Sequence, residues 1–232
     1  MRLIQIPFSH NCVKVRRALE LKGLPFETLD IAPMKREPVA AASGQRLVPV
    51  LEDRGRATAD STAILRYLEA TYPERPLEPA DPGGRAECWL LEDWADQAFM
   101  AATRRLAYWT VVHTPGAIEQ LFFPRGRGLR RRLLARVARR VVRRRFGLSA
   151  ERERRDENEV PRRAALAADR LGDRAFLVGD CLTVADVTLA AMTAPLWIAT
   201  PSVRDDAAVR KLLTWGETVL GPAVVGMYRR PV

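Results

Sequence analysis

The sequence predicts an α/β domain at the N-terminus followed by an all-helical domain. Over the first eighty residues, short apolar runs and amphipathic stretches follow in the order strand, helix, strand, strand, strand, helix. The stretch PERPLEPADPGG at 73–84 is rich in Pro and Gly, which favours a domain boundary there. Beyond it, apolar residues recur at spacings of three and four, as in amphipathic helices.

Local signals support each element of the first domain. The helix over 12–22 places Cys12, Val15 and Leu19 on one face, and Gly23 with Pro25 just beyond is typical of a helix end. The letters DRG between two short runs predict a tight hairpin. The expected strands are 2–6, 26–31, 48–53 and 56–59, and the expected helices are 12–22 and 60–72, with 32–46 irregular or weakly helical.

Helix signals also order the second domain. A long helix is expected over 86–109, with Trp89, Leu90 and Trp94 among its periodic apolar residues. Ser149 is a candidate N-cap for a helix that runs toward 171, and Pro161 is expected to kink or split that helix. Thr183 and Asp186 have the spacing of a capping box, and a last helix is expected over about 205–219.

The positive charge is concentrated in one segment. The formal net charge is +10, but residues 125–145 hold eleven Arg and no acid, so subtracting that segment leaves −1. The segment is amphipathic, with Leu133, Val137 and Val141 in one row and Leu134, Ala138 and Val142 in the adjacent one. The basicity therefore belongs to one element.

Cysteine usage and hydropathy exclude several classes of protein. Cys12, Cys88 and Cys181 are far apart and odd in number, and the chain has only two His, so neither a disulfide framework nor a metal site is expected. No stretch approaches the length of a membrane-spanning helix, and the N-terminus lacks the apolar region of a signal peptide. A reducing, cytoplasmic setting is expected.

Pro49 interrupts an apolar run that otherwise predicts a strand. A cis Val48–Pro49 bond at the start of the strand would leave the backbone N–H and C=O of Val48 facing outward, where a short peptide can pair with them. The alternative is an ordinary proline on an edge strand.

Asp60 and Ser61 lie where the hairpin meets the next helix. A helix N-terminus favours a bound carboxylate, Ser61 can donate its hydroxyl to the same anion, and Asp60 can hold an ammonium. Together they suit the head group of an α-amino acid. The alternative is plain N-capping of the helix.

Ser9 and Cys12 lie at the start of the first helix, in PFSHNCVKVRRALELKG. The positive end of the helix dipole makes a thiol there more acidic and more nucleophilic. Ser9 can hydrogen-bond a thiolate that a ligand brings in, or it can cap the helix. Cys12 is a candidate activated thiol, or a small core residue in line with Val15 and Leu19.

These stretches resemble the cytosolic glutathione transferases. The pieces that carry the resemblance are SHNCVKVR, LVPVLED, ADSTAILRYLEATYPERPL and FLVGDCLTVADVTLAA, whose order and spacing cover nearly the whole chain except about 113–150. The resemblance implies the glutathione transferase fold, with a thioredoxin-like α/β N-terminal domain at 1–76, a linker at 77–84 and an all-helical C-terminal domain at 85–232. Within that domain, the extra Arg-rich helix is expected at about 125–146.

The resemblance also implies roles for matching residues. Ser9 falls where the family contacts the glutathione sulfur, which makes this a Ser-x-x-Cys variant with Cys12. Val48 before Pro49 matches the residue that pairs with the cysteinyl backbone, and Asp60–Ser61 matches the pair that holds the γ-glutamyl group. Because SGQRLVP is one residue longer than the family's turn, three residues share the expected contact with the glycyl carboxylate: Lys35, Gln45 and Arg46.

Three functions follow as hypotheses. The first is a detoxifying transferase in which the thiolate of glutathione, a co-substrate used without a metal, attacks a small electrophile held by the helical domain. The second is glutathione-dependent thiol–disulfide exchange through Cys12, which requires an exposed thiol. The third is a non-catalytic scaffold that binds an anionic membrane surface or a partner protein through 125–145. Nucleic acid is not expected because aromatic residues for stacking are absent there. The resemblance also implies a homodimer.

Overall fold

A computed structural model describes residues 1–124 and 126–229, in two compact units. The first unit comprises Met1–Ala95 and Asp173–Ala191, and the second comprises Asp96–Gly172 with the residues from Met192 onward. Arg125, the first residue of the Arg-rich segment, lies outside the described residues.

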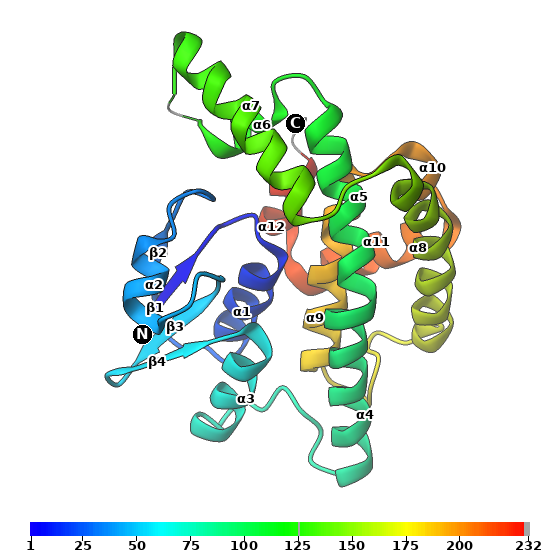
Figure 1. Ribbon diagram of the computed structural model, residues 1–232. Coiled ribbons are helices and arrows are strands. Elements are labelled where there is room, and N and C mark those ends of the chain that lie inside the picture. The colour runs from blue at the N-terminus through cyan, green and yellow to red at the C-terminus, as the bar shows by residue number, and fades with distance from the viewer. Residues whose placement is uncertain (125, 230–232) are drawn as a thin grey trace. The chain divides into compact units, whose positions relative to one another are not determined.

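The first unit is built on a four-stranded mixed sheet in the order β2-β1-β3-β4 (Figure 1). β1 pairs in parallel with β2, while β3 pairs antiparallel with both β1 and β4. The elements of this sheet region are β1 (Arg2–Gln5), α1 (His10–Leu21), β2 (Glu27–Asp30), α2 (Glu37–Ser43), β3 (Val50–Asp53), β4 (Arg56–Ala59) and α3 (Ser61–Thr71).

Helices cover both faces of this sheet. Val39 of α2 joins a core cluster with Ile4 and Val50, and residues alternate between faces along a strand. Leu3 and Leu51 are the neighbouring cross-strand pair and are almost fully buried. They therefore point toward the opposite face of the sheet from α2, where α1 and α3 pack together (Figure 1). This arrangement brings the N-termini of α1 and α3 into one unit with the β3 edge.

The predicted hairpin is confirmed in detail. β3 and β4 are joined by Arg54 and Gly55, whose φ angles are 49° and 76°. Positive φ at both central residues is the signature of the turn that matches the twist of antiparallel strands, and glycine adopts it without steric cost.

The remaining elements are helical. They are α4 (Pro82–Asp93), the π-helical η1 (Trp94–Phe99), α5 (Met100–His113), α6 (Ala117–Phe122), α7 (Gly128–Arg145), α8 (Ala150–Leu171), α9 (Val184–Thr193), the 3₁₀ turn η2 (Ala194–Ile198), α10 (Pro201–Arg204), α11 (Ala207–Leu220) and α12 (Pro222–Arg229). The sequence did not predict α12 or the π-helical stretch.

Two predicted caps are confirmed. Ser149 accepts a hydrogen bond from the backbone N–H of Arg152 at 3.2 Å. The Asp186 carboxylate accepts from the backbone N–H and the hydroxyl of Thr183 at 2.8 and 2.7 Å, and from the Leu177 N–H at 2.8 Å. The capping box therefore also ties the preceding loop to α9.

Two other expectations need correction. Helix α8 continues through Pro161, so of the two expected effects the split is wrong; buried Val160 and Ala164 pack on both sides of the proline and outweigh one lost backbone hydrogen bond. Leu90 was counted on the apolar face of its helix, but it is 71% exposed, and Cys88 and Glu92 are buried instead. No helix in the described part of the chain is long and apolar enough to cross a membrane.

Candidate active site

Ser9 precedes α1 in extended conformation, with φ −74° and ψ 121°. Its backbone N–H donates to the carbonyl of Ile6 at 2.9 Å, and its own carbonyl accepts from Val13 at 2.8 Å. Its side chain does not cap the helix. The hydroxyl is instead hydrogen-bonded to the thiol of Cys12, so Ser9 occupies the N-cap position but leaves the first N–H groups of α1 to other acceptors.

Cys12 is a core residue. Its side chain is completely buried, and burial raises the pKa of the thiol to about 11, although hydrogen bonds to Ile6 and Ser9 act in the opposite direction. The positive charges of Arg16 and Arg36 also favour the thiolate, but less strongly. The thiol is therefore protonated at neutral pH, and the exposure that thiol–disulfide exchange requires is absent.

Arg16 and Arg36 are the charged groups at this site that the sequence did not single out. Arg16 lies one helical turn after Cys12, a spacing that places both on one side of α1, so the sequence contained a usable signal for it. Arg36 comes from the segment before α2, where its Nε donates to the carbonyl of Pro33 at 2.9 Å. No local pattern points to Arg36, because folding alone brings it near α1.

The Val48–Pro49 peptide bond is cis, as predicted. Strand β3 begins at Val50, which pairs with Ile4 and Ala59. Within the described residues, Val48 takes part in no backbone hydrogen bond. Its N–H and C=O therefore remain available to an extended ligand.

Asp60 caps helix α3 and has a backbone conformation that is rare for a residue with a side chain. Its φ is 76° and its ψ is 129°, and its carboxylate accepts from the N–H of Ala63 at 3.0 Å. The capping interpretation is thus confirmed for Asp60. Ser61 is 3% exposed, and its hydroxyl makes no hydrogen bond to another described residue.

The three candidates for the glycyl carboxylate differ in what they already contact. The Gln45 amide forms hydrogen bonds to both the N–H and the carbonyl of Leu47, which braces the turn before Val48. Lys35 is exposed, and the Arg46 guanidinium lies 4.0 Å from the Glu37 carboxylate in a loose, exposed pair. Gln45 is thus used within the loop, whereas Lys35 and Arg46 keep their charges at the surface.

A buried ion pair lies one helical turn below the α3 N-terminus. Lys14 of α1 pairs with Glu92 of α4, and both side chains are at most 1% exposed. Thr62, the residue after Ser61, accepts from the Lys14 ammonium at 3.2 Å and donates to Glu92 at 2.8 Å. This network, which the sequence did not predict, connects α1, α3 and α4 directly behind the site.

Comparison with known proteins finds similar sequences for the N-terminal part of the chain. Residues 3–76 match the family model described as glutathione S-transferase, N-terminal domain. Maleylpyruvate isomerase from Ralstonia sp is 37% identical over 89 residues, which are 37% of this chain and 42% of that protein. Protein LigF from Sphingobium sp. is 36% identical over 95 residues, or 38% of this chain and 37% of that protein. The chain thus spans less than half the length of these curated relatives.

Solved structures match over the full length. The β-etherase LigF from Sphingobium sp. strain SYK-6 has a TM-score of 0.74 at 22% identity and covers 99% of both chains. A glutathione S-transferase from Methylobacterium radiotolerans, solved with glutathione sulfonate, has a TM-score of 0.68 at 25% identity and covers 100% of this chain and 95% of that one. Residues 3–76 are therefore similar to the N-terminal domain of glutathione S-transferases, and the fold of the chain is that of the glutathione transferases.

Proposed function

We propose that the protein is a glutathione transferase in which the glutathione thiolate attacks a small electrophile. The observation that carries the proposal is the Ser9 hydroxyl, which lies at the start of α1 and does not cap the helix. It belongs to the domain that matches the glutathione S-transferase N-terminal family. A donor at this position, beside the positive end of the helix dipole, favours the thiolate form of a bound thiol.

The bound tripeptide would use three groups of this unit. The carboxylate of the γ-glutamyl head would accept hydrogen bonds from the Ser61 hydroxyl and the first N–H groups of α3, and Asp60 would hold its ammonium. The cysteinyl backbone would pair with Val48 beside Pro49. Lys35 and Arg46 would face the glycyl carboxylate, with Gln45 holding the loop in shape.

The chemical step follows from this placement. The thiol proton leaves to solvent, and the thiolate sulfur forms a bond to an electrophilic carbon. Where the electrophile has a leaving group, that group departs with the bonding electron pair. Ser9 acts by donating its hydroxyl hydrogen to the sulfur, which lowers the energy of the thiolate relative to the thiol.

The names of two relatives suggest electrophiles for a substrate screen. One is named a maleylpyruvate isomerase and another is a β-etherase, so maleylpyruvate and a β-ether belong in a substrate screen beside an aryl halide. Thiol–disulfide exchange through Cys12 is disfavoured, because its thiol is buried and protonated.

Replacing Ser9 tests the mechanism. A hydrogen bond to a charged group is worth about 1.5–3 kcal/mol, so Ser9→Ala should lower kcat/KM with an aryl halide about 10- to 100-fold. The ultraviolet absorbance of the bound thiolate, titrated with pH, should show a higher pKa for the glutathione thiol. Ser43→Ala is a matched control, because that hydroxyl donates to the Val39 carbonyl within α2 and should leave both readouts unchanged. Full activity in Ser9→Ala would remove Ser9 from the mechanism.

We also propose that the catalytic form is a homodimer. In each protomer, residues 1–76 form the glutathione-binding domain, residues 77–84 form the linker and residues 85–232 form the helical domain. Light scattering of the purified chain should give twice its 26.0 kDa mass. The surface role expected for the Arg-rich segment is separate from this chemistry, because that segment belongs to the second unit and Ser9, Val48 and Asp60 belong to the first.

A further inference from the structure

Helix α7 presents three rows of residues, each repeating every fourth position. Because such positions lie above one another on a helix, each row marks one strip of its surface. We call them the arginine row (Arg132, Arg136, Arg140 and Arg144), the aliphatic row (Leu129, Leu133, Val137 and Val141) and the packed row (Leu134, Ala138 and Val142). The aliphatic row lies between the other two.

The packed row attaches the helix to its own unit. Ala138 and Val142, together with Ala135, belong to a core cluster with residues of α5 and α6. Small side chains let the helix backbones approach closely. Just beyond α7, the ring of Phe146 stacks on Tyr108, one of the half-buried residues of α5, at 4.3 Å between centroids. Helix α7 is therefore a fixed part of the second unit.

The aliphatic row faces solvent instead of this core. From Leu129 to Val141 its side chains are 81, 60, 53 and 42% exposed, and Leu134 beside it is 41% exposed. This row has the same spacing as the packed row, but only Ala138 and Val142 of the packed row are buried. A contiguous exposed apolar strip on one helix is characteristic of an interaction surface.

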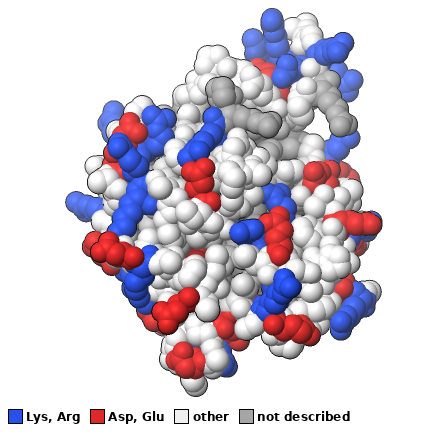
Figure 2. Space-filling view, turned by 180° about the vertical axis from the view of Figure 1, so that it is seen from behind, with Lys and Arg blue, Asp and Glu red and all other residues white. Residues whose placement is uncertain are grey.

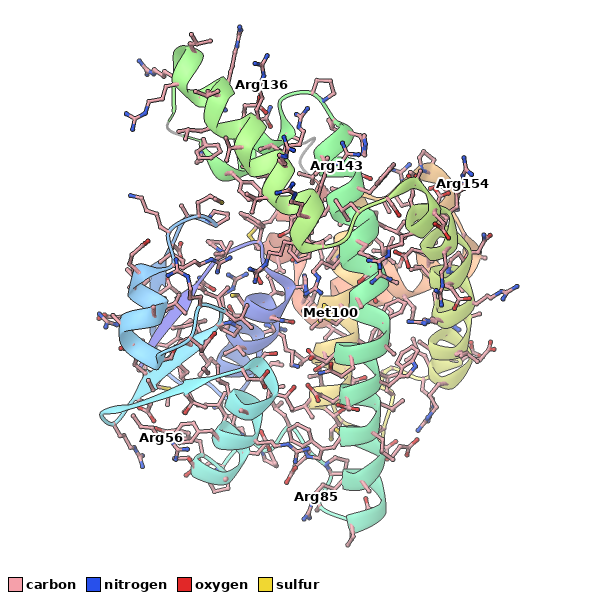
Figure 3. The ribbon with its side chains drawn as sticks, viewed as in Figure 1. Arg56, Arg85, Met100, Arg136, Arg143 and Arg154 are labelled. Atoms are coloured by element: carbon pink, nitrogen blue, oxygen red, sulfur yellow. The ribbon has the colours of Figure 1, made fainter. Side chains whose placement is uncertain are left out.

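The arginine row has no acidic residue on its own helix. Helix α7 contains nine Arg and neither Asp nor Glu. None of its arginines forms an ion pair within the part of the chain that the structure describes. Arg136 and Arg143 project from the helix in Figure 3, and Figure 2 shows basic side chains gathered at the end of the molecule where α7 lies.

We propose that α7 is a docking surface for an anionic lipid bilayer. The aliphatic row enters the boundary between headgroups and acyl chains, and the arginine row binds lipid phosphates beside it. The strip from Leu129 to Val141 is about 18 Å long at 1.5 Å per residue, too short to span a bilayer but suited to a helix that lies in the interface plane. The proposal does not depend on glutathione chemistry, because it uses the second unit alone.

A bilayer explains both exposed rows, whereas other polyanions explain only one. Nucleic acid would engage the arginines through phosphates but would leave the aliphatic row in water, and α7 itself offers no aromatic ring for stacking. A second copy of the chain could cover the aliphatic row, but it would bring a second set of uncompensated arginines against the first.

Vesicle sedimentation with the full chain tests the proposal. We expect binding to vesicles of phosphatidylcholine with phosphatidylserine, weak binding to phosphatidylcholine alone, and loss of binding at high salt. The variant R132Q/R136Q/R140Q should lower the partition coefficient about 100-fold, because each charge near the surface contributes about 1 kcal/mol, or about fivefold. L133S/V137S should lower it about tenfold or more, since two aliphatic side chains no longer leave water.

Matched controls come from α8. Its exposed arginines permit the variant R154Q/R155Q/R162Q, which removes the same charge from a helix where acidic residues are interspersed (Arg154 is labelled in Figure 3). Leu166 is 64% exposed and permits the apolar control L166S. Both controls should bind vesicles within about twofold of the parent chain. Circular dichroism and thermal melting check that every variant is folded.

Three results would overturn the proposal. If L133S/V137S binds vesicles as well as the parent chain, the aliphatic row does not enter lipid. If R154Q/R155Q/R162Q weakens binding as much as the α7 arginine variant, net charge and not α7 is responsible. If L133S/V137S instead changes the mass in solution and leaves vesicle binding intact, the row is an interface between copies.

Discussion

The buried pair between Lys14 and Glu92 allows a quantitative test of what holds the first unit together. Both side chains are at most 1% exposed, so the pair is shielded from water. Glu92→Gln keeps the shape and removes one charge. Removing one partner of a buried ion pair costs about 3–5 kcal/mol of unfolding free energy. Lys14→Met should cost a similar amount, because it leaves the Glu92 carboxylate buried with only the Thr62 hydroxyl as donor.

The double variant Lys14→Met with Glu92→Leu should be much less destabilised than either single one. It removes both charges and fills the same space with apolar groups, a replacement that is often neutral or stabilising by about 1–4 kcal/mol. The remaining cost is the Thr62 hydroxyl, which loses both partners at about 1–3 kcal/mol. The double-mutant cycle is closed with the single variants Lys14→Met and Glu92→Leu, and its coupling energy should reach about 3 kcal/mol or more.

Urea unfolding followed by circular dichroism measures these differences. The exposed pair between Arg2 and Glu52, at 2.6 Å with side chains 53 and 29% exposed, is the control in the same unit. Glu52→Gln should cost less than about 1 kcal/mol. A Glu92→Gln variant as stable as Glu52→Gln, or a double variant whose cost equals the sum of the single ones, would refute the reasoning.

Two further predictions follow. Burial opposes ionisation of Asp53, but hydrogen bonds from the hydroxyls of Tyr72 and Tyr67 outweigh it and hold the pKa of this carboxyl below its ordinary value. The stabilisation is therefore present above about pH 4 and is lost as pH falls through the lower pKa of the folded state. The stability that Asp53→Asn loses relative to the parent chain should therefore shrink in acid, and a loss that stays constant with pH would contradict this. In the native protein a thiol reagent should modify the exposed Cys181 and spare the buried Cys12. Mass spectrometry of the labelled peptides measures this, and labelling of Cys12 would contradict its assignment to the core.

The sequence predicted those features whose causes are local. The hairpin depends on two residues that adopt positive φ, and the capping box depends on a hydroxyl and a carboxylate three residues apart. The cis bond before Pro49 followed from a conflict between proline and a strand at one position. Each of these is decided within a few residues, so no knowledge of the rest of the chain is needed.

Features that depend on distant partners were not predictable. Lys14 lies between two valines in a buried stretch of α1, and its partner Glu92 is 78 residues away in α4. The two apolar rows of α7 have the same spacing, so periodicity alone does not say which one packs on α5 and α6. The smaller side chain of Ala138, with Ala135 beside it, permits the closer approach, and the larger leucines remain outside.

The two candidate catalytic residues at the start of α1, Ser9 and Cys12, differ in burial and in hydrogen bonding. Ser9 is the N-cap residue of α1 and Cys12 lies in its first turn, so the helix dipole favours an anion near either one. Cys12, inside the core, has no access to a substrate, and its own thiolate is disfavoured by burial more than the nearby arginines favour it. Ser9 precedes the helix and keeps a hydroxyl that no backbone N–H uses. A reactive sulfur at this helix start must then come from a bound thiol, and we infer that Ser9 serves that thiol as a hydrogen-bond donor and does not itself attack.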